Sequence, residues 1–240
     1  MLRIAMVLKR GGIYTVDYAR RLAQGVRQHL GGEYDILCLT DLSDAECEPL
    51  LDCGVDTLVP LESESPGWWA KMELFKLSGP IIYFDLDTVI MGRLDPLVAW
   101  TRRSTPYLLM LKGFIQGRPP QSGVMAWCDD VSGIWDYYQA ALQAGATFGG
   151  RPGRHALYWK GTQYRGDQDF IVDAIHPASL QIRHVQDIMP GVHSYKRHLQ
   201  SRRAPMGDER IVCFHGEPRL HDLKSGHWMR TIWEAHESTD

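Results

Sequence analysis

Hydrophobic side chains in the first ninety residues fall into short apolar runs that alternate with segments of helical spacing. The apolar runs have the length of buried strands and occupy residues 2–8, 34–39, 55–61 and 80–84. Residues 15–30 instead carry apolar side chains at helical spacing and end at the pair Gly31-Gly32, which stops a helix. A second helix is expected over 66–77, where Pro66 opens the segment. This alternation predicts a mostly parallel sheet with helices on both faces.

The second half of the chain is less regular. Strands are expected at 107–111, 122–127, 179–185 and 210–216, and helices at 130–145, 167–175 and 226–236. The stretch 146–166 is rich in glycine, arginine and aromatic residues without a clear period, so it predicts a long functional loop. The fold class is therefore α/β, with an irregular second half.

Composition removes several function classes. The chain has 240 residues, 44% of them hydrophobic and 23% charged, which is typical of a globular domain. A net charge of −3 gives no electrostatic argument for a nucleic-acid partner. Five cysteines without a C-x-x-C pair argue against a disulfide framework and fit a reducing compartment. Because no apolar segment approaches the roughly 20 residues of a membrane span, we expect a cytoplasmic protein without an integral membrane segment.

Two carboxylates end the apolar run in "PIIYFDLDTVI", residues 80–90. Side chains alternate along a strand, so Asp85 and Asp87 should point to the same side. Two carboxylates held together repel each other unless a positive charge lies between them, which predicts a divalent cation with oxygen ligands. Ligands of such sheets bind beyond the carboxyl ends of the strands, where Lys9 is also expected, so Lys9 is a candidate for ligand binding.

Two metal chemistries use this pattern. In haloacid-dehalogenase-type phosphatases a D-x-D-x-[TV] motif follows the first strand, and Asp85 would be the nucleophile with Asp87 as acid/base. Here three strands and two helices precede the motif. In nucleotide-sugar glycosyltransferases an Asp-x-Asp holds Mn²⁺ or Mg²⁺ against the donor diphosphate, where the metal acts as a Lewis acid. The position in the chain favours the transferase, and a catalytically silent sugar-binding relative stays open as an alternative.

Four segments resemble one family in the same order along the chain. They are "KMELFKLSGPIIYFDLDTVIMGRLDPL", "QSGVMAW", "GDQDFI" and "CFHGEPRLHDL", and together they run from Lys71 to Leu223. They resemble the GT-A glycosyltransferases related to glycogenin and to the bacterial lipopolysaccharide galactosyl- and glucosyltransferases. The resemblance implies one GT-A-like domain over 1–240, with a nucleotide-binding half at 1–95 and an acceptor- and sugar-binding half at 96–240.

The resemblance also implies roles for single residues. Asp85 and Asp87 would bind the metal, Mn²⁺ or Mg²⁺, with Asp85 also close to the ribose of the donor. Asp167 and Gln168 fall on the acid–amide pair that contacts the transferred sugar, which makes them the catalytic candidates. The further donor-binding candidates are Lys9, Lys71, Gln121, Ser122 and Arg219.

The terminal segments depart from the family pattern at several positions. Gln121 stands where asparagine is usual, and Leu220 replaces the usual proline. Arg219 stands where lysine is usual, which keeps a cation but makes it bidentate. Strict spacing puts Cys213 on the metal-ligand position, with His215 two residues later on the same face of the expected strand. Because an imidazole suits Mn²⁺ better than a thiolate, we predict His215 as the third metal ligand.

The function implied is transfer of a hexose from a UDP-sugar to an unknown acceptor, which would be a glycan, a lipid-linked glycan or a protein. The relatives that it resembles retain the anomeric configuration, so retention is expected. Trp68 and Trp69 are interpreted as core or loop-anchoring aromatics rather than as a platform for a sugar. The basic run 195–203 is interpreted as a solvated face, with a seat for an anionic acceptor or a membrane surface as its alternative.

Overall fold

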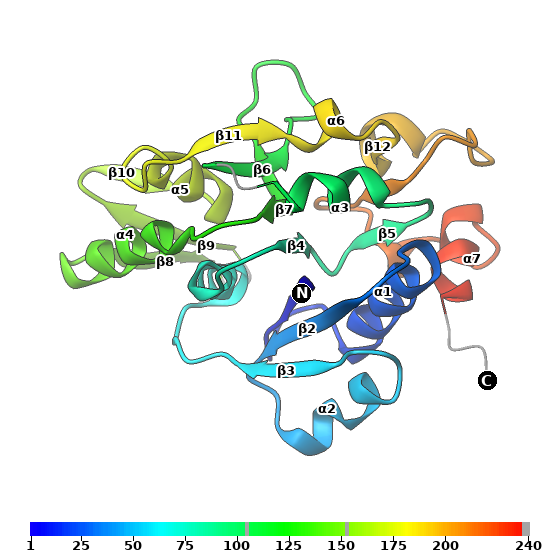
Figure 1. The fold of residues 1–240 in the computed structure, drawn as a ribbon, viewed down its shortest axis with the longest axis horizontal. Helices are drawn as coiled ribbons and strands as arrows, with labels where there is room; N and C mark the ends of the chain where they lie inside the picture. The colour runs from blue at the N-terminus through cyan, green and yellow to red at the C-terminus, as the bar shows by residue number, and fades with distance from the viewer. Residues whose placement is uncertain (104–105, 152–153, 237–240) are drawn as a thin grey trace.

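A seven-stranded sheet forms the centre of the molecule in the computed structural model, which describes residues 1–103, 106–151 and 154–236. The strand order is β11-β6-β7-β4-β1-β2-β3, with β4 in the middle (Figure 1). Only β7 runs antiparallel to its described neighbours, β4 and β6. The strands are β1 (Leu2–Leu8), β2 (Tyr34–Thr40), β3 (Thr57–Pro60), β4 (Ile81–Phe84), β6 (Tyr107–Leu111), β7 (Gln121–Trp127) and β11 (Gln181–His184). The mostly parallel sheet predicted from the sequence is confirmed.

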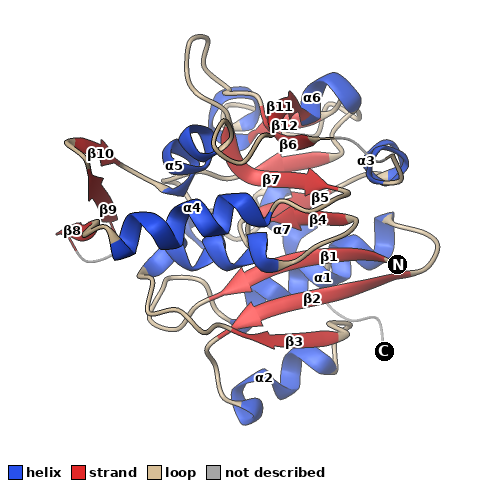
Figure 2. Cartoon of the chain, turned by 60° about the vertical axis from the view of Figure 1, so that its left-hand side comes forward, coloured by secondary structure: helices blue, strands red, loops and turns tan. Residues whose placement is uncertain are grey.

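Helices cover both faces of this sheet. They are α1 (Val16–His29), α2 (Asp44–Leu51), η1 (Gly67–Lys76), α3 (Asp95–Thr101), α4 (Ser132–Gln143), α5 (Asp167–Ala174), α6 (Val185–Ile188), η2 (Tyr195–Leu199), η3 (Leu220–Asp222) and α7 (Trp228–Ala235). Figure 2 shows α4 across the near face of the sheet, with α1 and α7 behind it. The alternation of side chains explains the two cores: Ile4 and Met6 of β1 pack with α1, whereas Ala5 packs with η1 and α4.

Two small sheets complete the fold. One joins β12 (Val192–Ser194), β13 (Ile211–Cys213) and β5 (Thr88–Ile90), which places β13 beside the residues that follow Asp87. The other joins β8 (Thr147–Arg151), β9 (Arg154–Trp159) and β10 (Thr162–Tyr164) as an antiparallel meander. The prediction that 146–166 is a long loop was therefore wrong, and a functional role of the segment stays a prediction. Leu157 and Trp159 are buried while Tyr158 between them is exposed, a period of two that the surrounding glycines and arginines hide in the sequence.

Several element boundaries differ from the sequence prediction. The segment 66–77 forms a 3₁₀ helix, η1, whose residues from Trp69 to Phe75 are all buried, so it lacks a single apolar stripe. Helix α2 was not expected; it begins at a capping box, in which Ser43 N donates to Glu46 Oε2 at 2.9 Å. The expected strand 210–216 ends at Cys213, so His215 lies outside it. None of the described helices is both long and apolar enough to span a membrane.

The buried imidazole of His236 makes the stability of this fold depend on pH. Its ring packs against Gly25 of α1, where an added Cβ would lie 2.9 Å from Nδ1. The pKa of His236 is lowered to about 4, chiefly by burial and in smaller part by the charges of His29 and Arg21. Below a pH of about 6.5 the unfolded chain binds the proton first, so the folded state loses stability as the pH falls toward 4.

We expect this one group to lower the free energy of unfolding by about 2 kcal/mol between pH 7 and pH 5. Urea titrations at both pH values measure it. The variant His236→Gln should lose that part of the pH dependence, because the unfolded chain no longer has this proton to take up. The matched control is His176→Gln at an exposed histidine, which should behave as the wild type. The same pH dependence in both variants would contradict the assignment.

Candidate active site

Asp85 and Asp87 lie in the turn that joins β4 to β5, at the carboxyl edge of the sheet. The turn is fixed by its backbone: Asp85 N donates to Gly123 O at 2.8 Å, and Thr88 N donates to Asp85 O at 3.0 Å. On its other side, Phe214 N donates to Asp87 O at 3.1 Å. Both carboxylates therefore belong to a loop that backbone hydrogen bonds fix between the main sheet and the β12-β13-β5 sheet.

A buried cluster joins four of the residues predicted from the sequence. Lys71 Nζ lies 2.8 Å from Asp85 Oδ1 and 3.0 Å from Asp167 Oδ2. The hydroxyl of Ser122 accepts from Lys71 Nζ at 3.1 Å and donates to Asp167 Oδ2 at 2.5 Å. These side chains come from four elements: η1, the β4–β5 turn, β7 and the start of α5. The structure thus brings Lys71, Asp85, Ser122 and Asp167 together, and we call them the lysine cluster.

The ammonium group and the carboxylates of the lysine cluster stabilise each other in their charged forms. Burial alone would lower the pKa of Lys71, but the carboxylates of Asp167 and Asp85 outweigh it and raise the pKa above its usual value. The ammonium group is therefore charged although Lys71 is only 5% exposed. Tyr83 OH donates to Asp85 Oδ1 at 2.5 Å, and burial keeps its pKa well above the usual value. Tyr83 was missed by the sequence analysis, because its ring reads as part of the apolar strand.

Asp87 has a separate set of partners. Tyr14 OH donates to Asp87 Oδ2, and Arg219 Nη1 in turn donates to Tyr14 OH. Arg219 Nη1 also lies 3.6 Å from Asp87 Oδ2. Burial raises the pKa of Asp87, and the nearby charge of Asp85 raises it further. Tyr14 was also missed, although its place in the loop after β1, at the same sheet edge as Lys9, was the available indication.

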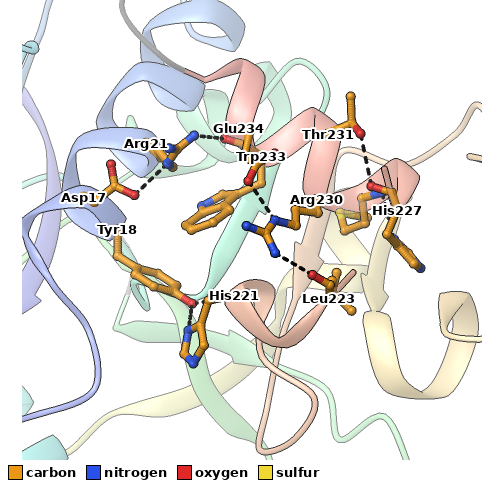
Figure 3. Close-up of polar contacts among 11 residues, drawn as sticks. Asp17, Tyr18, Arg21, His221, Leu223, His227, Arg230, Thr231, Trp233 and Glu234 are labelled. Carbon is orange, nitrogen blue, oxygen red and sulfur yellow. Dashed lines mark hydrogen bonds and ion pairs between the residues drawn. The ribbon is translucent and has the colours of Figure 1, made fainter. Parts of the chain in front are cut away.

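The segment of His221 and Leu223, which directly follows Arg219 in the chain, is held near α1 by the contacts that Figure 3 shows. Tyr18 OH and His221 Nδ1 lie 2.6 Å apart, which ties η3 to the first helix. Arg21 Nη1 donates to Trp233 O at 3.3 Å, and Arg230 Nη1 donates to Leu223 O at 2.7 Å. Helix α7 therefore packs on α1 and fixes the loop from which Arg219 reaches Asp87.

Three other candidates lie at or near this edge. Lys9 follows β1 and pairs with Asp41 at 3.1 Å, beyond the end of β2. Gln121 opens β7 directly before Ser122 and is half-buried. Gln168 follows Asp167 in the first turn of α5 and is also half-buried. Their predicted contacts with a donor or sugar stay predictions.

The third metal ligand predicted from the sequence, His215, makes its side-chain contacts away from the aspartates among the described residues. His215 Nε2 lies 2.6 Å from Ser194 Oγ, and the imidazole stacks on Phe114 with ring centroids 5.7 Å apart. Cys213 pairs with Thr88, the residue after Asp87. Burial raises the pKa of its thiol, and the charges of Asp87 and Asp85 raise it further. His215 as a ligand therefore stays a prediction, and it would require the imidazole to leave Ser194.

The two aspartates suit a divalent cation with oxygen ligands. Asp85 and Asp87 share one turn, and burial together with their mutual repulsion raises the pKa of Asp87 despite Arg219 nearby. Asp85 Oδ1 is used by Lys71 and Tyr83, whereas Oδ2 faces Gly123, where an added Cβ would lie 3.3 Å away. Among the described residues, no three His, Cys, Asp or Glu side chains are grouped as ligands. Mg²⁺ commonly binds through one or two carboxylates and completes its shell with water and substrate oxygens.

The fold matches solved glycosyltransferase structures, although the sequence matches no family model and no curated protein. Glycosyltransferase GlyE of Streptococcus pneumoniae TIGR4 aligns over 100% of this chain with a TM-score of 0.67 and 13% identity. This chain spans 62% of the length of that protein. Galactosyltransferase LgtC, crystallised with donor and acceptor sugar analogs, has a TM-score of 0.60 and 10% identity, with 100% of this chain and 98% of that chain covered.

The bifunctional glycosyltransferase WbbM has a TM-score of 0.58 and 11% identity over 97% of this chain and 51% of its own. Likeness at such identities establishes the fold alone. The GT-A-like α/β fold predicted from the sequence is confirmed.

Proposed function

We propose that this chain is a glycosyltransferase that moves a hexose from a UDP-sugar, bound with Mn²⁺ or Mg²⁺, to an acceptor with retention of configuration. One observation carries the proposal. The buried lysine cluster and Asp87 meet at the carboxyl edge of a sheet whose fold is that of solved glycosyltransferases. The division into a nucleotide-binding half, 1–95, and an acceptor-binding half, 96–240, belongs to the same proposal.

In this proposal Asp85 and Asp87 hold the cation, and the cation neutralises charge on the departing diphosphate. Arg219 offers a planar guanidinium to the same phosphates, because it already extends from the terminal loop to Asp87. The two carboxylate oxygens of Asp85 have different partners in this proposal. Oδ1 is bound by Lys71 and Tyr83, which leaves Oδ2 for a ligand. Gly123 has no side chain that would fill this space.

Lys71 is a positioning residue in this proposal. Its ammonium group holds Asp85 and Asp167 at the same time, so it sets the distance between the residue proposed for the metal and the residue proposed for the sugar. Ser122 fixes the orientation of the Asp167 carboxylate through a 2.5 Å hydrogen bond. Asp167 and Gln168 open α5, so the free backbone N–H groups of the helix start face the same region. A sugar hydroxyl bound here would meet oriented acceptors and donors.

The function is tested with UDP-hexoses and Mn²⁺ in the absence of an added acceptor. We expect slow release of UDP with water as a poor acceptor, and no release of phosphate from p-nitrophenyl phosphate. Fast phosphate release would favour the phosphatase, in which Asp85 is a nucleophile, although Asp85 here follows the fourth strand along the chain. Tight UDP binding without turnover of any UDP-hexose would favour the catalytically silent relative. The anomeric configuration of a product, read by NMR, tests retention.

A further inference from the structure

A basic segment lies directly beside the proposed active site. It follows β12 and includes η2, a single π-helical turn over Tyr195–Leu199. Its exposed basic side chains are Lys196, Arg197, His198, Arg202 and Arg203. Within the part of the chain that the structure describes, no carboxylate forms an ion pair with its lysine or arginines. Because the whole chain has a net charge of −3, this positive charge is a local feature.

Lys196 and Arg197 are the two cations of this segment that come soonest after β12. Strand β12 is linked by strand pairing to the residue that follows Asp87. Ser194 pairs with Cys213, and Cys213 pairs with Thr88, the residue after Asp87. Two strand spacings separate Ser194 from Thr88, which is roughly 10 Å. Burial lowers the pKa of His215, and the charges of Lys196 and Arg197 lower it further, which agrees with their closeness to His215.

An aromatic surface adjoins these two cations. Phe114 and His215 stack with an interplanar angle of 13°, and Phe114 also meets the edge of His198 at 5.7 Å. Phe114 belongs to the loop 112–120 between β6 and β7, which also exposes Lys112 and Arg118. A flat apolar ring next to unpaired cations suits a ligand with one sugar face and one anionic group.

The carboxylates of the same region are engaged elsewhere. Asp208 Oδ1 lies 3.6 Å from His193 Nε2. Glu209 is buried, and its two carboxylate oxygens accept from Met206 N at 2.6 Å and from Gly207 N at 2.8 Å. These acids therefore stabilise the loop before β13, and in the described part of the chain neither forms an ion pair with Lys196 or Arg197.

We propose that the acceptor is a saccharide with an anionic group, a phosphate or a carboxylate, and that Lys196 and Arg197 bind this group while Phe114 contacts the sugar. This inference rests on the proposed function, since it assigns the acceptor of the same site. The position favours a saccharide over a membrane surface. Anionic lipid would be attracted by every exposed cation of the segment, with each contributing a similar amount, whereas an acceptor in the site contacts the two cations beside it.

The test is a titration by isothermal calorimetry with three probes: glucose, glucose 6-phosphate and glucuronate. Each titration is run with UDP and Mn²⁺ and again without them. We expect at least one of the anionic sugars to bind about tenfold or more tighter than glucose, because charge-assisted hydrogen bonds are the stronger ones. The double variant K196Q/R197Q should lose this preference. The matched control is R202Q/R203Q, which removes two charges from the same segment and should keep it.

The outcomes separate the two proposals. Equal binding of glucose and both anionic sugars, or an equal loss in both double variants, would overturn the acceptor assignment while UDP binding in the presence of Mn²⁺ stands. Absence of UDP binding in the wild type would instead overturn the proposed function. Co-sedimentation with phosphatidylserine vesicles, lost equally in both variants and accompanied by no preference for anionic sugars, would assign the segment to a membrane surface and overturn the inference.

Discussion

The variant Lys71→Met should lower the free energy of unfolding by about 3–5 kcal/mol, because it leaves the buried carboxylate of Asp167 and the half-buried carboxylate of Asp85 without their counter-charge. Lys71 and Asp167 have side chains only 6% and 9% exposed, so water cannot replace the lost ammonium group at Asp167. Asp85 would lose the same partner. Urea titration at neutral pH measures the change, and the same variant should lose the UDP-hexose turnover proposed for this site.

Lys76→Met is the matched control, because Lys76 lies on the same 3₁₀ helix and also pairs with two carboxylates, Glu62 and Glu73. Its side chain is 32% exposed. The carboxylate of Glu73 is buried, but it also accepts hydrogen bonds from Glu62 N and Ser63 N, so it keeps partners when Lys76 is removed. The ion pairs of Lys76 should therefore contribute less than about 1 kcal/mol. The double variant Lys71→Met/Asp167→Asn should recover part of the lost stability, since it removes a charge along with its partner. A loss in Lys71→Met no larger than that in Lys76→Met would show that the lysine does not hold the buried acids.

The sequence could indicate the centre of this site because it depends on local rules. Alternation along a strand predicted Asp85 and Asp87 on one side, but β4 ends at Phe84 and both residues lie in the turn after it. The sheet-edge rule still placed them where ligands bind. Lys71, Ser122 and Asp167 came from the family resemblance, because no local pattern shows that η1, β7 and α5 meet. The structure confirms that these three side chains converge with Asp85.

The two residues that the sequence analysis missed, Tyr83 and Tyr14, are aromatic side chains that contact the aspartates of the site through their hydroxyl groups. Tyr83 is buried in the core, and only its hydroxyl reaches Asp85. Tyr14 lies in a loop without periodicity, and its contact with Arg219 joins positions 205 residues apart. Such long-range contacts depend on how α7 and η3 pack on α1, which single-sequence patterns do not determine.

His215 shows why a strand end matters for a ligand prediction. The rule that places residues i and i+2 on one face holds only while the strand continues. Strand β13 ends at Cys213, so the chain turns before His215 and its imidazole reaches Ser194. Cys213 itself lies within the strand and pairs with Thr88, the residue after Asp87.

The variant Asp87→Asn should weaken metal-dependent UDP binding by more than about 100-fold. Loss of a side chain that binds the metal itself weakens binding more than loss of a side chain that only orients a metal ligand. Asparagine keeps the shape of Asp87 and can still accept from Tyr14, so the change removes the charge and little else. Isothermal calorimetry with UDP, in Mn²⁺ and again in EDTA, measures the effect. Equal UDP affinity in EDTA and Mn²⁺ for the wild type would contradict a metal-bound donor.

Three further variants locate the rest of the metal shell. Tyr14→Phe frees Asp87 Oδ2 from its phenol and should keep or strengthen Mn²⁺ affinity, which separates loss of a ligand from general damage.

If His215 is the third ligand, His215→Ala should lose Mn²⁺ affinity while Cys213→Ser keeps it, because an imidazole suits this ion better than a thiol. The reverse result would place the thiol nearer the metal, in keeping with the pairing of Cys213 with Thr88, the residue after Asp87. If His215→Ala and Cys213→Ser both keep their Mn²⁺ affinity, the two aspartates are the ligands that the protein supplies. The other coordination positions of the metal are then open to the diphosphate and water.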